Sequence, residues 1–148
     1  MWYFNASLME APLFLKISDA ANLGIHALVY MAERHGQGKP VATAEAAEAF
    51  KVSANHLSKV LQRLTRAGLV KSIRGPRGGF VLARDPDRIN LHEIYEAIDG
   101  EIAAHHRCVL GKKACSYKEC VFGSLVDDIQ QKVSTQFLAS TLDKLIHR

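Results

Sequence analysis

The sequence predicts a mainly α-helical protein with a small β-hairpin, arranged as a winged helix-turn-helix followed by a long C-terminal dimerisation helix. Two amphipathic helical segments joined by about three residues lie between Thr43 and Gly68. A hairpin pattern centred on glycine and proline follows at once, over 69–82. Apolar residues then recur at helical spacing over 122–147, near the C-terminus.

Composition favours one small globular protein. The chain has 148 residues, of which 48% are hydrophobic and 23% charged, too apolar a mixture for a disordered chain. No apolar run approaches the roughly 18 residues that a membrane span requires, and the N-terminus lacks the features of a secretory signal. We therefore expect a soluble, cytoplasmic protein without a membrane partner. We divide it into an N-terminal extension (1–14), a winged-helix DNA-binding domain (15–84) and a cysteine loop with a dimerisation helix (85–148).

Helix signals define the first half. Apolar residues at spacings of three and four predict a helix that starts at Ser18, with Ser18 or Asp19 as its cap, and ends before the glycines and proline of 35–40. A short helix is expected from Thr43, which is suited to be its N-cap. After a turn at 51–53, Ser53 or Asn55 opens the next helix, and Gly68 closes it. The expected buried stripe of this helix is Leu57, Val60, Leu61 and Leu64.

The second half is expected to begin with a turn at 84–87 and a short helix over 91–99 that Gly100 stops. The stretch 103–120 shows little periodicity and is predicted to be a loop. A single helix from about 122 to 147 would be about 37 Å long, more than the small domain can cover with its own core. Pairing of two such helices predicts a symmetric homodimer.

Positive charge is concentrated in one region. The net charge is +4, yet residues 53–84 contain seven lysines and arginines and no acid, so the remainder of the chain is net negative. A local positive field of this kind attracts polyanions, nucleic acid first among them. The alternative is an ordinary solvated face, which we consider the weaker interpretation because acids are completely absent from this region.

The candidate DNA contacts lie at the start of the second helix of the pair and in the hairpin. In a winged helix this helix enters the major groove and the hairpin reaches the backbone or the minor groove. Asparagine can pair with adenine, whereas lysine and arginine on the helix suit phosphates. Ser53 or Asn55 could instead only cap the helix, and His56 could be an ordinary surface residue. The predicted DNA-binding residues are Ser53, Asn55, His56, Ser58, Lys59, Arg63, Arg74 and Arg77.

Three cysteines, Cys108, Cys115 and Cys120, lie close together in the predicted loop. Three thiolates can converge on a metal or an iron–sulfur cluster, with His105, His106 or a partner residue as fourth ligand. Their spacing matches neither zinc-finger nor ferredoxin patterns, so buried free thiols or a redox-sensing thiol pair are equally compatible. A cysteine nucleophile is also conceivable, although no orienting third group is evident.

Residues 15 to about 130 resemble the Rrf-two family of bacterial winged-helix regulators. The resemblance rests on LKIS at 15–18, GIHALVYMA at 24–32, LTRAGLVKS at 64–72, IRGPRGGF at 73–80 and IDG at 98–100, ahead of the three cysteines. It implies a homodimer that binds a pseudo-palindromic operator in double-stranded DNA. It also implies that Cys108, Cys115 and Cys120 bind a two-iron or four-iron cluster.

The chain departs from the family pattern at three positions. The histidine that is the fourth ligand in one branch is Gly123 here, and the partner-subunit aspartate of another branch aligns with Asn22 of the partner subunit. A glutamate that selects operators in some members is Ser58. We expect a non-enzymatic, dimeric regulator, a repressor whose operator affinity is controlled by an iron–sulfur cluster. The alternatives are sensing through thiol oxidation or zinc, a cysteine-nucleophile enzyme, and a protein-interaction module.

Overall fold

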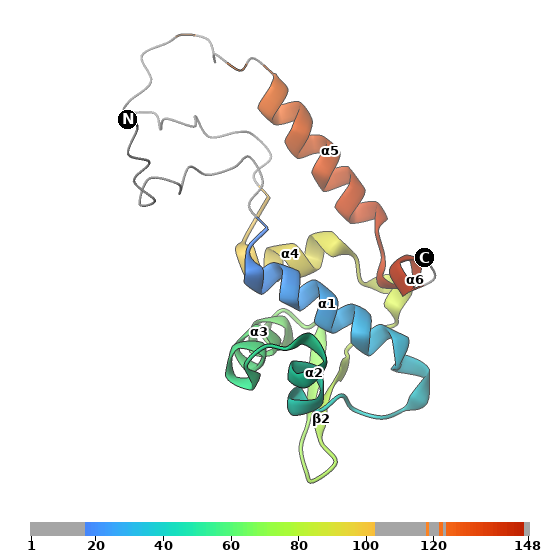
Figure 1. Cartoon of the computed structure of the whole chain (residues 1–148). Helices are drawn as coiled ribbons and strands as arrows, with labels where there is room; N and C mark the ends of the chain where they lie inside the picture. Colours follow the sequence, from blue (N-terminus) through green and yellow to red (C-terminus); the bar gives the residue numbers. More distant parts are fainter. Residues whose placement is uncertain (1–16, 103–117, 119–121, 123, 147–148) are drawn as a thin grey trace, which may run out of the picture. The chain divides into compact units, whose positions relative to one another are not determined.

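The structure is a computed structural model that describes residues 17–102, 118, 122 and 124–146 (Figure 1). The larger of two compact units comprises Ile17–Ile102 and Val133–Arg148; of the other, residues 118, 122 and 124–132 are described. The elements are α1 (Asp19–Glu33), η2 (His35–Gln37), α2 (Thr43–Phe50), α3 (Ala54–Arg66), β1 (Val70–Ile73), β2 (Gly79–Leu82), η3 (Pro86–Arg88), α4 (Leu91–Asp99), α5 (Leu125–Ala139) and α6 (Leu142–Ile146). This confirms the predicted fold class. Over the described ranges, no helix is long and apolar enough to cross a membrane.

Helix α1 is the centre of the larger unit and packs against α3, α4, α6 and β2. Gly24 lies where α1 passes closest to its neighbours. A Cβ added there would collide with Cδ1 of Ile98 in α4 and lie 3.4 Å from Cγ1 of Val60 in α3. The absence of a side chain at Gly24 therefore sets how closely these three helices approach.

The helix starts follow the cap predictions, with one exception. The Ser18 hydroxyl accepts a hydrogen bond from the Ala21 amide at 3.0 Å, and the Ser53 hydroxyl accepts one from the His56 amide at 3.1 Å. The prediction that Thr43 caps α2 is wrong: Thr43 is the first helical residue, and the N-cap Ala42 makes no side-chain cap bond. The reason is that Val41 is held in a β-bridge, so the chain stays extended only as far as Ala42.

Strands β1 and β2 form the predicted antiparallel hairpin, with Val70 opposite Leu82 and Ile73 opposite Gly79. A third extended residue joins it, because Val41 and Phe80 exchange two backbone hydrogen bonds of 2.9 Å. We call β1, β2 and the turn 74–78 between them the wing. The wing extends beyond α2 and α3 (Figure 1).

The turn at the wing tip is tightly defined. The Gly78 amide donates to the Gly75 carbonyl at 2.9 Å, so Pro76 and Arg77 are its central residues. Gly75 has φ +118°, a conformation that an L-residue rarely adopts. Among the described non-glycine residues only Lys51 has positive φ, so Arg77 has negative φ, as a type I turn requires.

The prediction of a single helix over 122–147 is wrong. α5 ends at Ala139, and a two-residue break, Ser140 and Thr141, precedes α6. The break forms because this segment pairs with residues around the start of α4. The Leu91 amide donates to the Ser140 carbonyl at 3.0 Å, and the Leu142 amide donates to the Ile89 carbonyl at 2.9 Å. Leu142 is thereby fully buried. Helix α6 therefore closes the core instead of lengthening α5. The predicted loop 103–120 and extension 1–14 lie outside the described residues, apart from Lys118.

Candidate nucleic-acid interface

Helix α3 has one buried and one exposed face. The predicted stripe of Leu57, Val60, Leu61 and Leu64 is buried. Because a helix turns by about 100° per residue, positions 55, 59, 62 and 66 lie opposite this stripe. We call these residues, Asn55, Lys59, Gln62 and Arg66, the α3 outer stripe; all four are exposed.

Sequence reasoning found only half of this stripe. Asn55 and Lys59 were predicted, whereas Gln62 and Arg66 were not proposed as contacts. The signal was available, because Gln62 and Arg66 follow Asn55 at spacings of seven and eleven, which keep residues on one helical face.

The other predicted α3 residues lie beside the stripe or are engaged elsewhere. His56 is exposed on one flank of α3, and Ser58 is half-buried on the other. The Ser53 hydroxyl accepts the cap bond described above. Nη1 of Arg63 donates to the Ile98 carbonyl of α4 at 3.4 Å, so its guanidinium binds a carbonyl in the last turn of α4.

The cations of 53–84 divide into partnered and unpartnered groups. Arg84 forms an ion pair with Glu93 at 2.8 Å, and Arg63 is bound to α4 as described. The remaining five have no hydrogen-bond or ion-pair partner for their side chains among the described residues, and all are exposed. These are Lys59, Arg66, Lys71, Arg74 and Arg77. The positive charge of this region is therefore available to a ligand.

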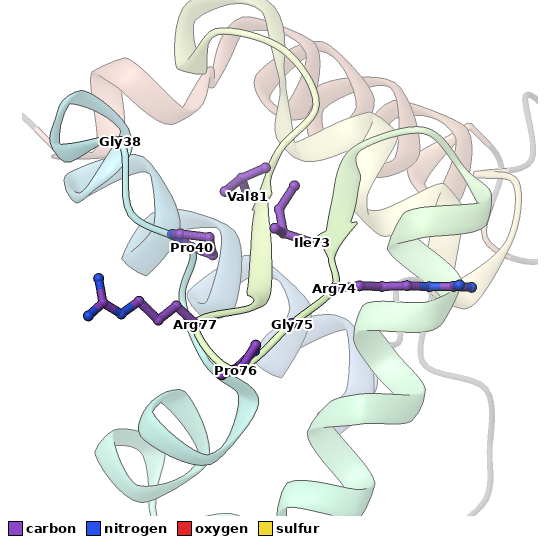
Figure 2. Close-up of a pocket in the computed structure, with 8 residues that line it drawn as sticks. All are labelled: Gly38, Pro40, Ile73, Arg74, Gly75, Pro76, Arg77 and Val81. Carbon is purple, nitrogen blue, oxygen red and sulfur yellow. The ribbon is translucent and has the colours of Figure 1, made fainter.

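The turn of the wing carries two of these cations on opposite sides. Figure 2 shows the side chains of Arg74 and Arg77 extending in opposite directions from the turn. Between the wing and the segment after η2 is a depression of about 650 Å³. Its lining comprises Gly38, Pro40, Ile73, Arg74, Gly75, Pro76, Arg77 and Val81. The wing thus presents both charge and apolar surface.

The predicted metal-binding residues are mostly outside the described part of the chain. Cys108, Cys115, Cys120, His105, His106 and Gly123 all belong to this group. Asn22 is described: it is exposed on α1, and its backbone carbonyl lies 2.8 Å from Nδ1 of His26. Within 17–102, 118, 122 and 124–146, no group of three or more histidine, cysteine or acidic side chains is placed to bind a metal.

The fold and this surface define a winged helix-turn-helix protein of the DNA-binding regulator class. A family model described as "Rrf2: Iron-dependent Transcriptional regulator" matches residues 17–148. The chain therefore belongs to the Rrf2 family of transcriptional regulators, which confirms the resemblance found in the sequence.

Individual relatives include proteins named IscR and CymR. The chain is 37% identical over 114 residues to the "HTH-type transcriptional regulator IscR" of Xenorhabdus nematophila, covering 76% of this chain and 68% of the relative. It resembles the solved structure of CymR, "the Global Cysteine Regulator of B. subtilis", with a TM-score of 0.78 and 29% identity over 90% of this chain and 97% of the other. The IscR structure from T. potens gives a TM-score of 0.70 and 27% identity over 90% and 87%.

Proposed function

We propose that this chain is a dimeric transcriptional repressor that contacts DNA through the α3 outer stripe and the wing. The observation that carries the proposal is the set of five exposed, unpartnered cations on α3 and the wing. Unpaired arginine and lysine side chains on a helix and an adjacent hairpin suit the phosphates and grooves of a duplex. Membership of a transcription-regulator family supports the same conclusion.

Each part of the surface has a distinct task in this proposal. Asn55, near the N-terminus of α3, can pair with the edge of adenine in the major groove, and Lys59 and Arg66 bind phosphates. The stiff wing turn presents an arginine to the minor groove, where a narrow A·T-rich segment attracts guanidinium. The Arg63 guanidinium, bound to α4, is assigned to holding α3 rather than to a phosphate.

A homodimer is part of the proposal. Leu138 in α5 is 53% exposed, a large apolar side chain that a partner helix would cover. Two copies related by a two-fold axis require a pseudo-palindromic operator, with half-sites about 34–36 Å or a multiple apart.

The signal is proposed to act through an iron–sulfur cluster held by Cys108, Cys115 and Cys120. Cysteine thiolates are the usual ligands of such clusters, so the donor set fits three ligand positions. His105, His106 and Asn22 of the partner subunit are the candidates for the fourth. Gain, loss or oxidation of a two-iron or four-iron cluster would change the charge on this segment and so the affinity for DNA. The description of the family model as iron-dependent supports this assignment.

A thiol sensor is the second candidate, and the likeness to CymR, the structure titled a cysteine regulator, favours it. Anaerobically purified protein should be brown and contain iron and sulfide, and Cys115→Ser and Cys120→Ser should each lower its iron content. Ser116→Ala, next to one of these cysteines, is the matched control. A colourless protein without iron or sulfide contradicts the cluster; stoichiometric zinc or a reversible thiol oxidation then identifies the alternative.

DNA binding itself is tested with a fluorescent duplex selected from a random pool, titrated at several salt concentrations. A salt-dependent affinity is expected, because each phosphate contact contributes about −0.9 to the slope of log K against log salt. Absence of binding, together with one alkylation-sensitive thiol, would indicate a cysteine enzyme instead. A protein-interaction module would show a protein partner whose binding survives Lys59→Ala and Arg74→Ala.

A further inference from the structure

The side of the wing that carries Arg77 faces a groove formed by two neighbouring depressions. The first is the depression of about 650 Å³ at the wing tip, and the second, of about 180 Å³, lies nearer α1. They share Gly38 and Val81, so they are adjacent, and both lie between the wing and the segment that joins η2 to α2. We call the two depressions together the groove. Figure 2 shows Pro40 and Arg77 on this side, with Arg74 pointing away.

The two walls of this groove are held in fixed relation. Val41 and Phe80 exchange hydrogen bonds of 2.9 Å in both directions, which joins the segment after η2 to β2. A Cβ at Gly79 would collide with the Val41 carbonyl, so the glycine permits this close approach. Gly38, with φ +64°, turns the chain from η2 into the segment that forms one wall of the groove. A ligand that binds here therefore meets a preorganised surface, which lowers the entropic cost of binding.

The chemistry of the walls selects an anion with an apolar body. No acidic residue lines either depression, whereas Ile73, Pro40, Val81 and Phe80 supply apolar surface. Three lining cations have no partner among the described residues: Arg74 and Arg77, which line the first depression, and Lys39, which lines the second. Of these, Arg77 lies on the same side of the wing as Pro40, whereas the Arg74 side chain points to the opposite side. The neighbouring Arg34 and His35 already pair with carboxylates, Glu33 and Glu45 for the first and Asp85 for the second.

We propose that this groove holds a stretch of the DNA sugar–phosphate backbone, with Arg77 and Lys39 as phosphate ligands and the apolar wall against deoxyribose. This inference rests on the proposed function and adds Lys39, outside both α3 and the wing, to the interface. It also gives the two wing arginines different roles. Arg77 faces the groove and binds the sugar–phosphate backbone, whereas Arg74, on the opposite side, is free to enter the minor groove. A sugar–phosphate chain matches the groove in charge, apolarity and extended shape.

The test compares Arg77→Gln and Lys39→Gln with Arg88→Gln in the full chain. Arg88 is an exposed arginine in η3, which follows the end of β2 away from the wing tip. Affinity is measured by fluorescence anisotropy for a mixed-sequence duplex and for a duplex selected from a random pool. Circular dichroism confirms that each variant is folded, and Arg77→Lys tests whether the charge suffices.

For Arg77→Gln and Lys39→Gln, the salt slope should fall in magnitude by about 0.9 per protomer. The change in affinity between 50 and 200 mM salt then shrinks by about 3.5-fold per protomer. Both duplexes should be affected by the same factor, because phosphate contacts carry no sequence information. Arg77→Lys and Arg88→Gln should keep the wild-type slope.

An unchanged salt slope in both glutamine variants overturns the proposal. A loss of affinity for the selected duplex alone also overturns it, because that result would indicate base or groove readout. Tight binding of a free deoxynucleotide to the wild type also overturns it, since the groove would then be a small-ligand site. In each of these outcomes the wild type still binds DNA in a salt-dependent way, so only the groove proposal fails. If the wild type shows no salt-dependent DNA binding, the proposed function itself fails.

Discussion

Replacing Gly24 with alanine should destabilise the fold through a single steric collision. The added methyl would overlap Cδ1 of Ile98 and lie 3.4 Å from Cγ1 of Val60 and 3.7 Å from Cδ1 of Leu64. Overpacking of a core costs about 1–3 kcal/mol, whereas the change from glycine to alanine in a helix stabilises it by about 1 kcal/mol. The net loss of stability should therefore be about 0–2 kcal/mol.

The collision is isolated by a double-mutant cycle with Ile98→Val, which removes the Cδ1 methyl. Ile98→Val alone should lower the free energy of unfolding by about 0.5–1.5 kcal/mol. In a protein that also carries Gly24→Ala it should lower it by less, because it relieves the overlap. Stability is measured by urea unfolding at fixed protein concentration, since a dimer would make it concentration-dependent. Ala44→Gly, at an exposed position in α2, calibrates the propensity contribution. Strictly additive losses in the cycle would refute the packing argument.

Three further outcomes follow from individual side chains. Arg63→Gln should weaken DNA binding but keep the wild-type salt slope, because the Arg63 guanidinium donates to the Ile98 carbonyl and not to a phosphate. A slope reduced by about 0.9 per protomer would instead show that Arg63 contacts a phosphate. Ser53→Ala should lower the free energy of unfolding by about 1 kcal/mol through loss of the cap, whereas Asn55→Ala should lower DNA affinity with little change in unfolding by urea. Burial raises the pKa of Tyr95, so the folded state favours the neutral phenol, and stability should be kept below pH 10 and lost above it. As pH rises above 10, the free energy of unfolding of Tyr95→Phe should fall less than that of the wild type. An equal fall in the two proteins would contradict this linkage.

Local patterns in the sequence were sufficient where structure depends on neighbours along the chain. The caps at Ser18 and Ser53, the buried stripe of α3 and the hairpin around Gly75 all depend on residues a few positions apart. Such interactions leave a readable spacing, because each satisfies a backbone group or an apolar face within one element.

The failed predictions depend on contacts between residues far apart in sequence. The helix expected over 122–147 breaks because Ser140 and Leu142 pair with the chain around 89–91. Helix α2 starts one residue earlier than expected, with Ala42 as its N-cap, because Val41 pairs with Phe80. The hydrogen bond from Arg63 to the carbonyl of Ile98, 35 positions away, is another such long-range contact, and the prediction that Arg63 contacts DNA stays untested. Periodicity carries no information on such pairings.

We propose that the α3 outer stripe and the wing form the DNA interface. The most direct test is the salt slope of a variant that combines Lys59→Gln, Arg66→Gln, Arg74→Gln and Arg77→Gln, compared with the wild type on one duplex. We expect a large loss of affinity and a slope reduced by about 0.9 for each contact removed, in a protein that remains folded. If a folded variant retains the wild-type affinity and slope, DNA binds elsewhere and this interface is wrong.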